Sequence, residues 1–266
     1  MTADDQRSTV ENRVENGNRP NVRTRTIVYV DGFNLYFGMR EATGHRDLWL
    51  NVFNVAHELA QERELVGVKY FTADVSGKGP NAGKAQRQRI YLAALQEACP
   101  DLQILKGKYQ VSRRRCRQCL HEWNHSEEKM TDVRIGVEIV RDAFLDRFDL
   151  AIVVSADSDL IPAVEAVQKD FGRRQNVRPR KGIIVAFPPK RQSAALKKVA
   201  DAAFDISTSI LRDNQLPPVV QRGQRTDLRR PEKWNGVGCN RTHRLTRYGP
   251  TGGFAAETQK RAWFEA

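Results

Sequence analysis

Short apolar runs alternate with segments of helical periodicity along most of this chain. Apolar runs rich in β-branched residues predict strands at 26–30, 65–72, 102–111, 150–154, 182–187 and 203–206. The segments between them predict helices at 33–40, 51–64, 84–98, 131–148, 158–171 and 193–203. Residues 113–129 are polar and interrupt this alternation as an insertion.

Alternation of strands and helices predicts an α/β fold. Helical crossovers between successive strands produce a parallel sheet with helices on both faces. In such sheets, ligands bind beyond the carboxyl ends of the strands. The residues that follow the strands at 26–30 and 150–154 are therefore where we expect the chemistry.

Positive charge is concentrated near the C-terminus. The chain has 44 Lys and Arg against 32 Asp and Glu, a net charge of +12 that favours a polyanionic partner, most often nucleic acid. Half of this surplus lies in residues 215–266, which contain few aliphatic side chains. We predict a flexible arm over 1–23, a folded domain over 24–214 and a basic, largely disordered tail over 215–266. The tail is either a solvating segment or an arm that binds phosphates.

Composition and motifs argue against several classes of protein. The chain has no run of 18 apolar residues and its first residues form no apolar signal segment, so we expect a cytoplasmic protein without a membrane partner. Neither a Walker A loop nor a GxGxxG motif is present, which argues against nucleotide-driven motors and dinucleotide enzymes. The sequence does not identify an oligomeric state.

Acidic side chains follow two of the predicted strands. Asp31 ends the first strand and Asn34 follows it, Asp157 and Asp159 follow the strand at 150–154, and Asp132 begins the helix before that strand. Crowded carboxylates raise one another's pKa unless a cation lies between them. Oxygen ligands favour Mg²⁺ or Mn²⁺, which can bind a phosphate oxygen and activate a water for in-line attack.

Each acid also has a purely structural alternative. Asp31 before Gly32 suits a turn, Asp132 suits the first turn of a helix, and Asp157 suits an N-cap. The Asp-Ser-Asp at 157–159 also fits a TOPRIM-like site, but that fold requires an early Glu where this chain has Asp31. A phosphatase of the haloacid dehalogenase type requires Asp-x-Asp after its first strand, which Asp-Gly-Phe at 31–33 does not provide.

Three segments form an ordered set of motifs: Val-Tyr-Val-Asp-Gly-Phe-Asn-Leu-Tyr at 28–36, Glu-Lys-Met-Thr-Asp-Val at 128–133 and Val-Ser-Ala-Asp-Ser-Asp-Leu-Ile-Pro at 154–162. In this order they resemble the opening, central and late motifs of the NYN domain family of PIN-like nucleases. The match covers about residues 26–210. The resemblance implies a three-layer α/β/α sandwich with a central, mainly parallel sheet, and the activity of a metal-dependent ribonuclease.

The resemblance also implies roles for individual residues. The family's acidic metal-site positions are matched by Asp31, Asp132, Asp157 and Asp159. Asn34 matches the polar residue that orients a water or a carboxylate, and hydroxyl support is expected from Thr131 and Ser155. The PIN pattern often has Glu where this chain has the shorter Asp132.

Soft metal ligands cluster in an insertion at 112–129. They are Cys116, Cys119, His121 and His125. CxxC is a standard half-site for tetrahedral Zn²⁺, and the family resemblance includes a Cys-Cys-x-His-Trp insertion of this kind. The alternative is a reduced thiol pair at a hairpin tip with both histidines solvated.

Basic side chains near the predicted site suit phosphate binding. The insertion carries Arg113, Arg114, Arg115 and Arg117, and the helix at 84–98 begins with Lys84 and Arg87. These side chains either follow the backbone of single-stranded RNA or form a solvated face.

The acidic residues and the family resemblance together predict a metal-dependent ribonuclease. The alternatives are a non-catalytic RNA-binding regulator on the same fold and, less favoured, a phosphatase or a TOPRIM-like enzyme acting on DNA.

The insertion leads to a first test. If Cys116, Cys119, His121 and His125 bind Zn²⁺, protein purified reduced and without chelator should contain about one zinc per chain by mass spectrometry of the metal. The Cys116→Ser and Cys119→Ser double variant, purified in parallel, should contain almost none. Equal zinc content in both proteins would contradict the ligand assignment and leave the nuclease prediction intact.

Overall fold

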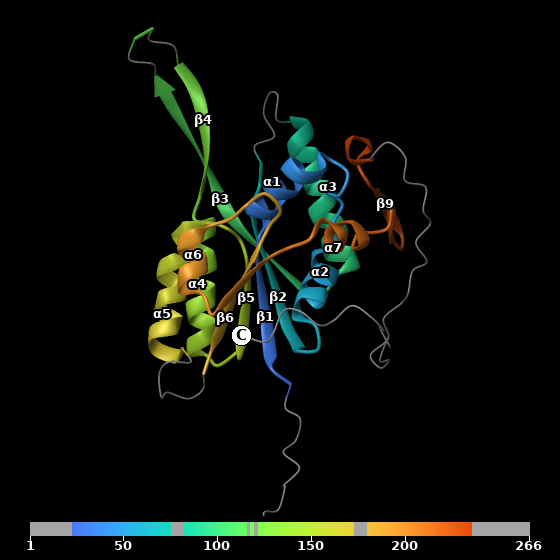
Figure 1. Cartoon of the computed structure of the whole chain (residues 1–266). Helices are drawn as coiled ribbons and strands as arrows, with labels where there is room; N and C mark the ends of the chain where they lie inside the picture. The colour runs from blue at the N-terminus through green and yellow to red at the C-terminus, as the bar shows by residue number, and fades with distance from the viewer. Residues whose placement is uncertain (1–22, 76–81, 116–117, 120–121, 173–179, 236–266) are drawn as a thin grey trace, which may run out of the picture. The chain divides into compact units, whose positions relative to one another are not determined.

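The structure is a computed structural model that describes residues 23–235, except 76–81, 116–117, 120–121 and 173–179 (Figure 1). The chain divides into two compact units, Met1–Gly236 and Val237–Ala266. The second unit and residues 1–22 lie outside the described residues, so the predicted N-terminal arm stays a prediction.

A seven-stranded sheet forms the centre of the first unit. Its strands are β1 (Arg25–Asp31), β2 (Glu64–Ala73), β3 (Leu102–Arg115), β4 (Glu122–Lys129), β5 (Leu150–Val154), β6 (Gly182–Phe187) and β7 (Ala202–Asp205). The strand order is β4-β3-β2-β1-β5-β6-β7, and every neighbouring pair is parallel except β3 and β4. The central strands are almost entirely buried, which explains their continuous apolar runs.

Helices cover both faces of this sheet and create two apolar cores (Figure 1). One core packs against α1 (Gly32–Thr43), α2 (Val52–Ala60), α3 (Ala82–Ala98) and α7 (Thr208–Asp213). The other packs against α4 (Thr131–Phe144), α5 (Ile161–Phe171) and α6 (Ala194–Val199). Alternate residues of β1 enter opposite cores, Val28 the first and Tyr29 the second. The predicted three-layer α/β/α sandwich with a mainly parallel sheet is confirmed.

The polar insertion is a β-hairpin. Strand β3 continues to Arg115 and pairs antiparallel with β4, with Ser112 opposite His125. This two-stranded ribbon continues past the ends of the other strands and extends away from the sheet (Figure 1). Residues 112–115 and 124–129 are polar at successive positions, so this part of the hairpin carries no apolar alternation from which strands could be predicted.

The prediction of a disordered tail from residue 215 does not hold for its first part. Strands β8 (Val219–Arg222) and β9 (Arg225–Arg229) form an antiparallel hairpin, followed by the short helix η3 (Glu232–Trp234). Val220 and Trp234 are each only 5% exposed, and the Trp234 ring lies 5.9 Å from that of Tyr91 on α3. A few widely spaced apolar side chains are enough to fold this segment because they pack on an existing core. Residues 236–266 lie outside the described residues.

A buried ionic network holds α4 against the sheet. The Lys69 ammonium on β2 lies 2.5 Å from Asp142 Oδ2 and 2.7 Å from Glu138 Oε2, both on α4. The Tyr29 hydroxyl on β1 donates to the same Asp142 oxygen at 2.7 Å. Breaking a buried pair leaves an uncompensated charge, so the network strongly favours one position of the helix. The first turn of that helix carries Asp132.

Replacing Trp234 tests whether residues 217–235 belong to the core. Trp234→Ala should lower the free energy of unfolding by about 3 kcal/mol or more, because a large buried ring is lost. Urea unfolding followed by far-UV circular dichroism measures this change. Deleting 237–266 is the control, because the boundary between the two units lies before Val237. If deleting 217–266 changed stability no more than this control, the hairpin and η3 would not belong to the core.

Candidate functional site

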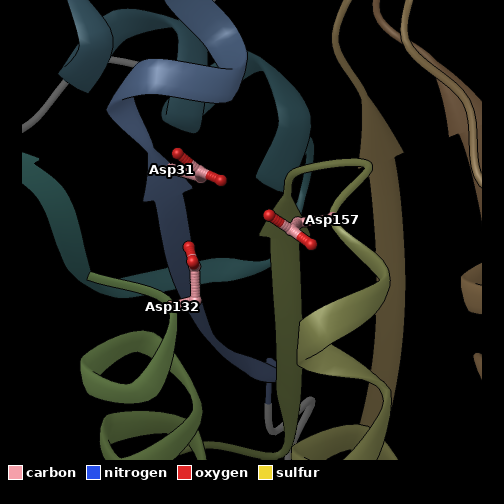
Figure 2. Close-up of side chains that lie close together, drawn as sticks. All are labelled: Asp31, Asp132 and Asp157. Carbon is pink, nitrogen blue, oxygen red and sulfur yellow. The ribbon is translucent and has the colours of Figure 1, made fainter. Parts of the chain in front are cut away.

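Three carboxylates converge at the carboxyl end of the central strands (Figure 2). Asp31 is the last residue of β1, Asp157 lies three residues beyond the end of β5, and Asp132 lies in the first turn of α4. One oxygen of each carboxylate lies within 4.8 Å of the other two. Strands β1 and β5 are parallel neighbours, with Val30 opposite Val154, and this pairing brings distant parts of the sequence together.

Asp31 is built into the fold on all sides. Its Oδ1 accepts the backbone N–H groups of Phe33 at 3.1 Å and Asn34 at 3.0 Å, so Asp31 is the N-cap of α1. Its Oδ2 accepts the hydroxyl of Ser155 at 2.9 Å. The residue is only 4% exposed, so its carboxylate is held rigidly and has little contact with water.

Burial and negative neighbours shift the ionisation of this group. The pKa of Asp31 is raised to about 6, mainly by burial, and the charges of Asp132 and Asp157 also raise it. The hydrogen bonds from Asn34 and Ser155 lower the pKa and offset part of this effect. Burial and the charge of Asp157 likewise raise the pKa of Asp132. The main causes of both shifts are burial, hydrogen bonds and neighbouring acids, and no described cationic side chain forms an ion pair with Asp31 or Asp132. Full ionisation of the three groups therefore favours an added cation.

Ser155, Asn34 and Thr131 lie around the carboxylates, and the roles predicted for them stay predictions. The Ser155 hydroxyl donates to Asp31 and accepts the N–H of Asp157 at 3.1 Å, so it joins two of the three acids. The Asn34 carbonyl oxygen accepts the N–H of Ala156 at 3.2 Å and ties α1 to the loop after β5. The buried Thr131 hydroxyl, beside Asp132, has no hydrogen-bond partner in the described part of the chain.

Asp159 lies beside the three carboxylates and is not one of them. Its N–H donates to Asp157 Oδ1 at 3.0 Å at the start of the short helix η2 (Ser158–Leu160). Its charge contributes to the raised pKa of Asp132. Its role as a metal ligand stays a prediction.

The three carboxylates fit a divalent cation. Oxygens bound to one Mg²⁺ lie at most about 4.2 Å apart, twice the usual Mg–O distance. The span of 4.8 Å is within a small side-chain rotation of that limit. The three candidate ligands are all oxygen donors, which suit Mg²⁺ or Mn²⁺. The residues Asp31, Asp132 and Asp157 can therefore hold such an ion.

Lys84 and Arg87 on α3 line a cavity of about 260 Å³. The same cavity borders Gly32 and Phe33, the two residues after Asp31. The two basic side chains were predicted from the sequence as phosphate-binding residues, but the cavity was not predicted. The sequence signal for an aromatic cavity is the presence of three aromatic residues within five positions at the start of α1, namely Phe33, Tyr36 and Phe37.

Two of the four predicted zinc ligands, Cys116 and His121, lie outside the described residues, as does Arg117. Cys119 is an exposed free thiol. His125 lies in β4, and Arg113, Arg114 and Arg115 lie in β3. Zinc binding and phosphate binding by this hairpin stay predictions.

The model of the NYN domain matches residues 25–207, more than half of the chain and all three converging acids. A curated relative from Pseudomonas putida, named 6-hydroxy-3-succinoylpyridine 3-monooxygenase HspA, is 25% identical over 248 residues, which cover 80% of this chain and 76% of the relative. A solved protein of unknown function from Vibrio parahaemolyticus is 23% identical, with a TM-score of 0.48, over 74% of this chain and 99% of that one. Among the described helices, none is long and apolar enough to span a membrane.

The ionisation of Asp31 can be tested through stability. Its pKa is about 6 in the folded chain against an ordinary value of 3.8, so metal-free folded protein binds this proton more tightly than unfolded protein does. The free energy of unfolding should therefore fall as the pH rises from about 4 to 7. At pH 7.5 in EDTA, Asp31→Asn should raise it by on the order of 2 kcal/mol, since the neutral amide can still cap α1.

Thermal unfolding at pH 5 and pH 7.5, with and without Mg²⁺, measures this effect. Mg²⁺ should stabilise the unmodified protein more at pH 7.5 than at pH 5, because protons compete for the carboxylates, and it should have little effect on Asp31→Asn. An Asp31→Asn protein that is less stable at both pH values would show that the carboxylate serves only as a cap.

Proposed function

This chain belongs to the NYN domain family, and we propose that it is a metal-dependent nuclease acting on RNA. The observation that carries the proposal is the convergence of Asp31, Asp132 and Asp157. One of these acids is buried, and no cation among the described residues balances it. Acids arranged in this way suit a hydrolytic site that works with Mg²⁺ or Mn²⁺.

The chain's own residues would organise the reaction around the three carboxylates. When bound there, a divalent ion stabilises negative charge on a phosphate oxygen and makes a water a better nucleophile. Ser155 keeps Asp31 and the loop carrying Asp157 in a fixed relation. The Thr131 hydroxyl, buried and without a hydrogen-bond partner among the described residues, would hydrogen-bond a water beside Asp132.

RNA is proposed as the substrate on the basis of charge and family. The net charge of +12 favours a polyanion, and the basic side chains of the hairpin and of α3 would hold its phosphates. We propose single-stranded RNA, because in-line attack requires a backbone that can rotate and a duplex resists that rotation. A non-catalytic RNA-binding regulator would use the same basic residues and would not need the carboxylates.

The name of the curated relative suggests a second candidate, a reaction on a small aromatic compound. The observation that favours it is the cavity of about 260 Å³, lined by aromatic side chains, that borders the residues after Asp31. Monooxygenation consumes O₂ and electrons from a reductant, whereas hydrolysis of a phosphodiester requires neither. Activity without a reductant therefore separates the two candidates.

Cleavage of labelled RNA tests the proposed function. Single-stranded RNA should be cut with Mg²⁺ or Mn²⁺, without O₂ or reductant, and should stay intact in EDTA. Asp157→Asn should lower the cleavage rate at least about a hundredfold, since several kcal/mol of stabilisation by the ion would be lost. Gel electrophoresis of the products measures the rate and shows whether cleavage is internal.

The matched control is Asp101→Asn, which neutralises an exposed acid before β3, at the opposite end of the parallel strands. Purified in parallel, it should cut at the unmodified rate. A contaminating nuclease would act equally in both preparations, so the difference between Asp101→Asn and Asp157→Asn excludes it as the source of the activity. The opposite outcome is that the unmodified protein and Asp157→Asn bind RNA equally tightly while neither cuts RNA with any metal. That result would contradict the nuclease proposal and support a non-catalytic RNA-binding regulator.

A further inference from the structure

The cavity beside the acidic site has aromatic walls. It lies between α1, the end of β2 and α3, and η3 contributes Trp234. Phe33, Tyr36, Tyr70 and Tyr91 contribute further rings. An apolar cavity of about 150 Å³ is enough to bind benzene, so about 260 Å³ accommodates a substituted ring system. Aromatic walls favour a flat ring, which can stack on them or meet their edges.

Positive charge surrounds the same cavity. Arg40, Lys84 and Arg87 line it, and within the described part of the chain none of the three forms an ion pair with an acid. Burial lowers the pKa of nearby His45, and the charges of Lys233, Arg40 and Arg87 lower it further. An anion would therefore be attracted to this side of the cavity.

The hydroxyl of Tyr70 is available in the cavity wall. Tyr70 is 6% exposed and lines the cavity, and its hydroxyl makes no hydrogen bond with any described residue. It can therefore hydrogen-bond a ligand or a water in the cavity. The ring also lies against the chain just after Asp31, because a Cβ at Gly32 would be 2.6 Å from the Tyr70 oxygen. The cavity and the acidic site thus share one wall.

We propose that this cavity binds an aromatic ring that carries an anionic group. The ring lies among the aromatic side chains, the anion lies against Arg40, Lys84 and Arg87, and the Tyr70 hydroxyl donates to a polar atom of the ligand. One source of this chemistry is a nucleotide of the strand that is cut, with its base in the cavity; this source rests on the proposed function. The other source is a free aromatic acid, which does not.

Isothermal titration in EDTA measures binding without cleavage. The probes are adenosine and uridine 5′-monophosphate, pyridine-3-carboxylate, adenosine and inorganic phosphate. A nucleotide should bind at least about tenfold more tightly than either adenosine or phosphate, since only the intact nucleotide uses both the rings and the cations. Tighter binding of pyridine-3-carboxylate than of either nucleotide would identify the free acid as the source and also support the proposal.

Two conservative variants locate the binding. Tyr70→Phe should weaken the tightest probe about threefold to tenfold, the loss of one hydrogen bond, without lowering the thermal midpoint. Arg87→Gln should weaken it by a similar factor, whereas Arg89→Gln should not. Arg89 is exposed on the same helix, two residues and therefore about 200° further round, and does not line the cavity.

Three results would overturn the proposal. They are no binding of any probe at millimolar concentration, binding of phosphate alone as tight as that of a nucleotide, or equal affinity in Tyr70→Phe and the unmodified protein. Asp157→Asn keeps the result separate from the proposed function, because it should bind the probe normally while failing to cut RNA. If the protein cuts RNA but binds none of the probes, the proposed nuclease function would stand and the proposed role of the cavity would be rejected.

Discussion

The carboxylate of Asp31 is almost sealed from water, and its hydrogen-bond donors among the described residues are all neutral. Ionising a buried group is costly, and the N-terminus of α1 and the Ser155 hydroxyl offset only part of that cost. Two further carboxylates lie close enough to raise its pKa. The fold thus concentrates negative charge where it is least stable. Such a cluster is tolerable when an added cation completes it, so a functional interpretation is stronger here than that of an ordinary turn or cap.

The architecture explains why residues 31, 132 and 157 meet. Parallel pairing of β1 with β5 brings two strand ends to the same edge, and Asp31 and Asp157 need only follow those ends. Asp132 comes from a helix, so its position depends on how α4 packs. The buried contact between Lys69 and Asp142 fixes that packing about three turns further along the same helix. The polar network in the core therefore positions the site without touching it.

Much of this arrangement could be predicted from the sequence because buried parallel strands are continuously apolar and acids directly after them must share an edge. The exceptions have physical causes. On α4, the helical spacing of Val133 and Val137 predicts a buried face, yet these residues are 68% and 57% exposed. Asp142 is fully buried instead and pairs with Lys69 on β2. Apolar spacing alone cannot identify the buried face when the core contains an ion pair. Composition likewise predicts disorder around Trp234, because it does not show which core a lone aromatic side chain will join.

Gly32 links the acidic site to the aromatic cavity. Directly after Asp31 the chain turns from strand into helix, and a Cβ at this position would lie 2.6 Å from both the Phe71 carbonyl oxygen and the Tyr70 ring. Only glycine lets the capping carboxylate and the tyrosine approach this closely. Burial raises the pKa of Tyr70 and the nearby Asp31 charge raises it further, so that hydroxyl stays protonated and able to donate. A ligand in the cavity and an ion at the carboxylates would therefore be separated only by the backbone of Gly32.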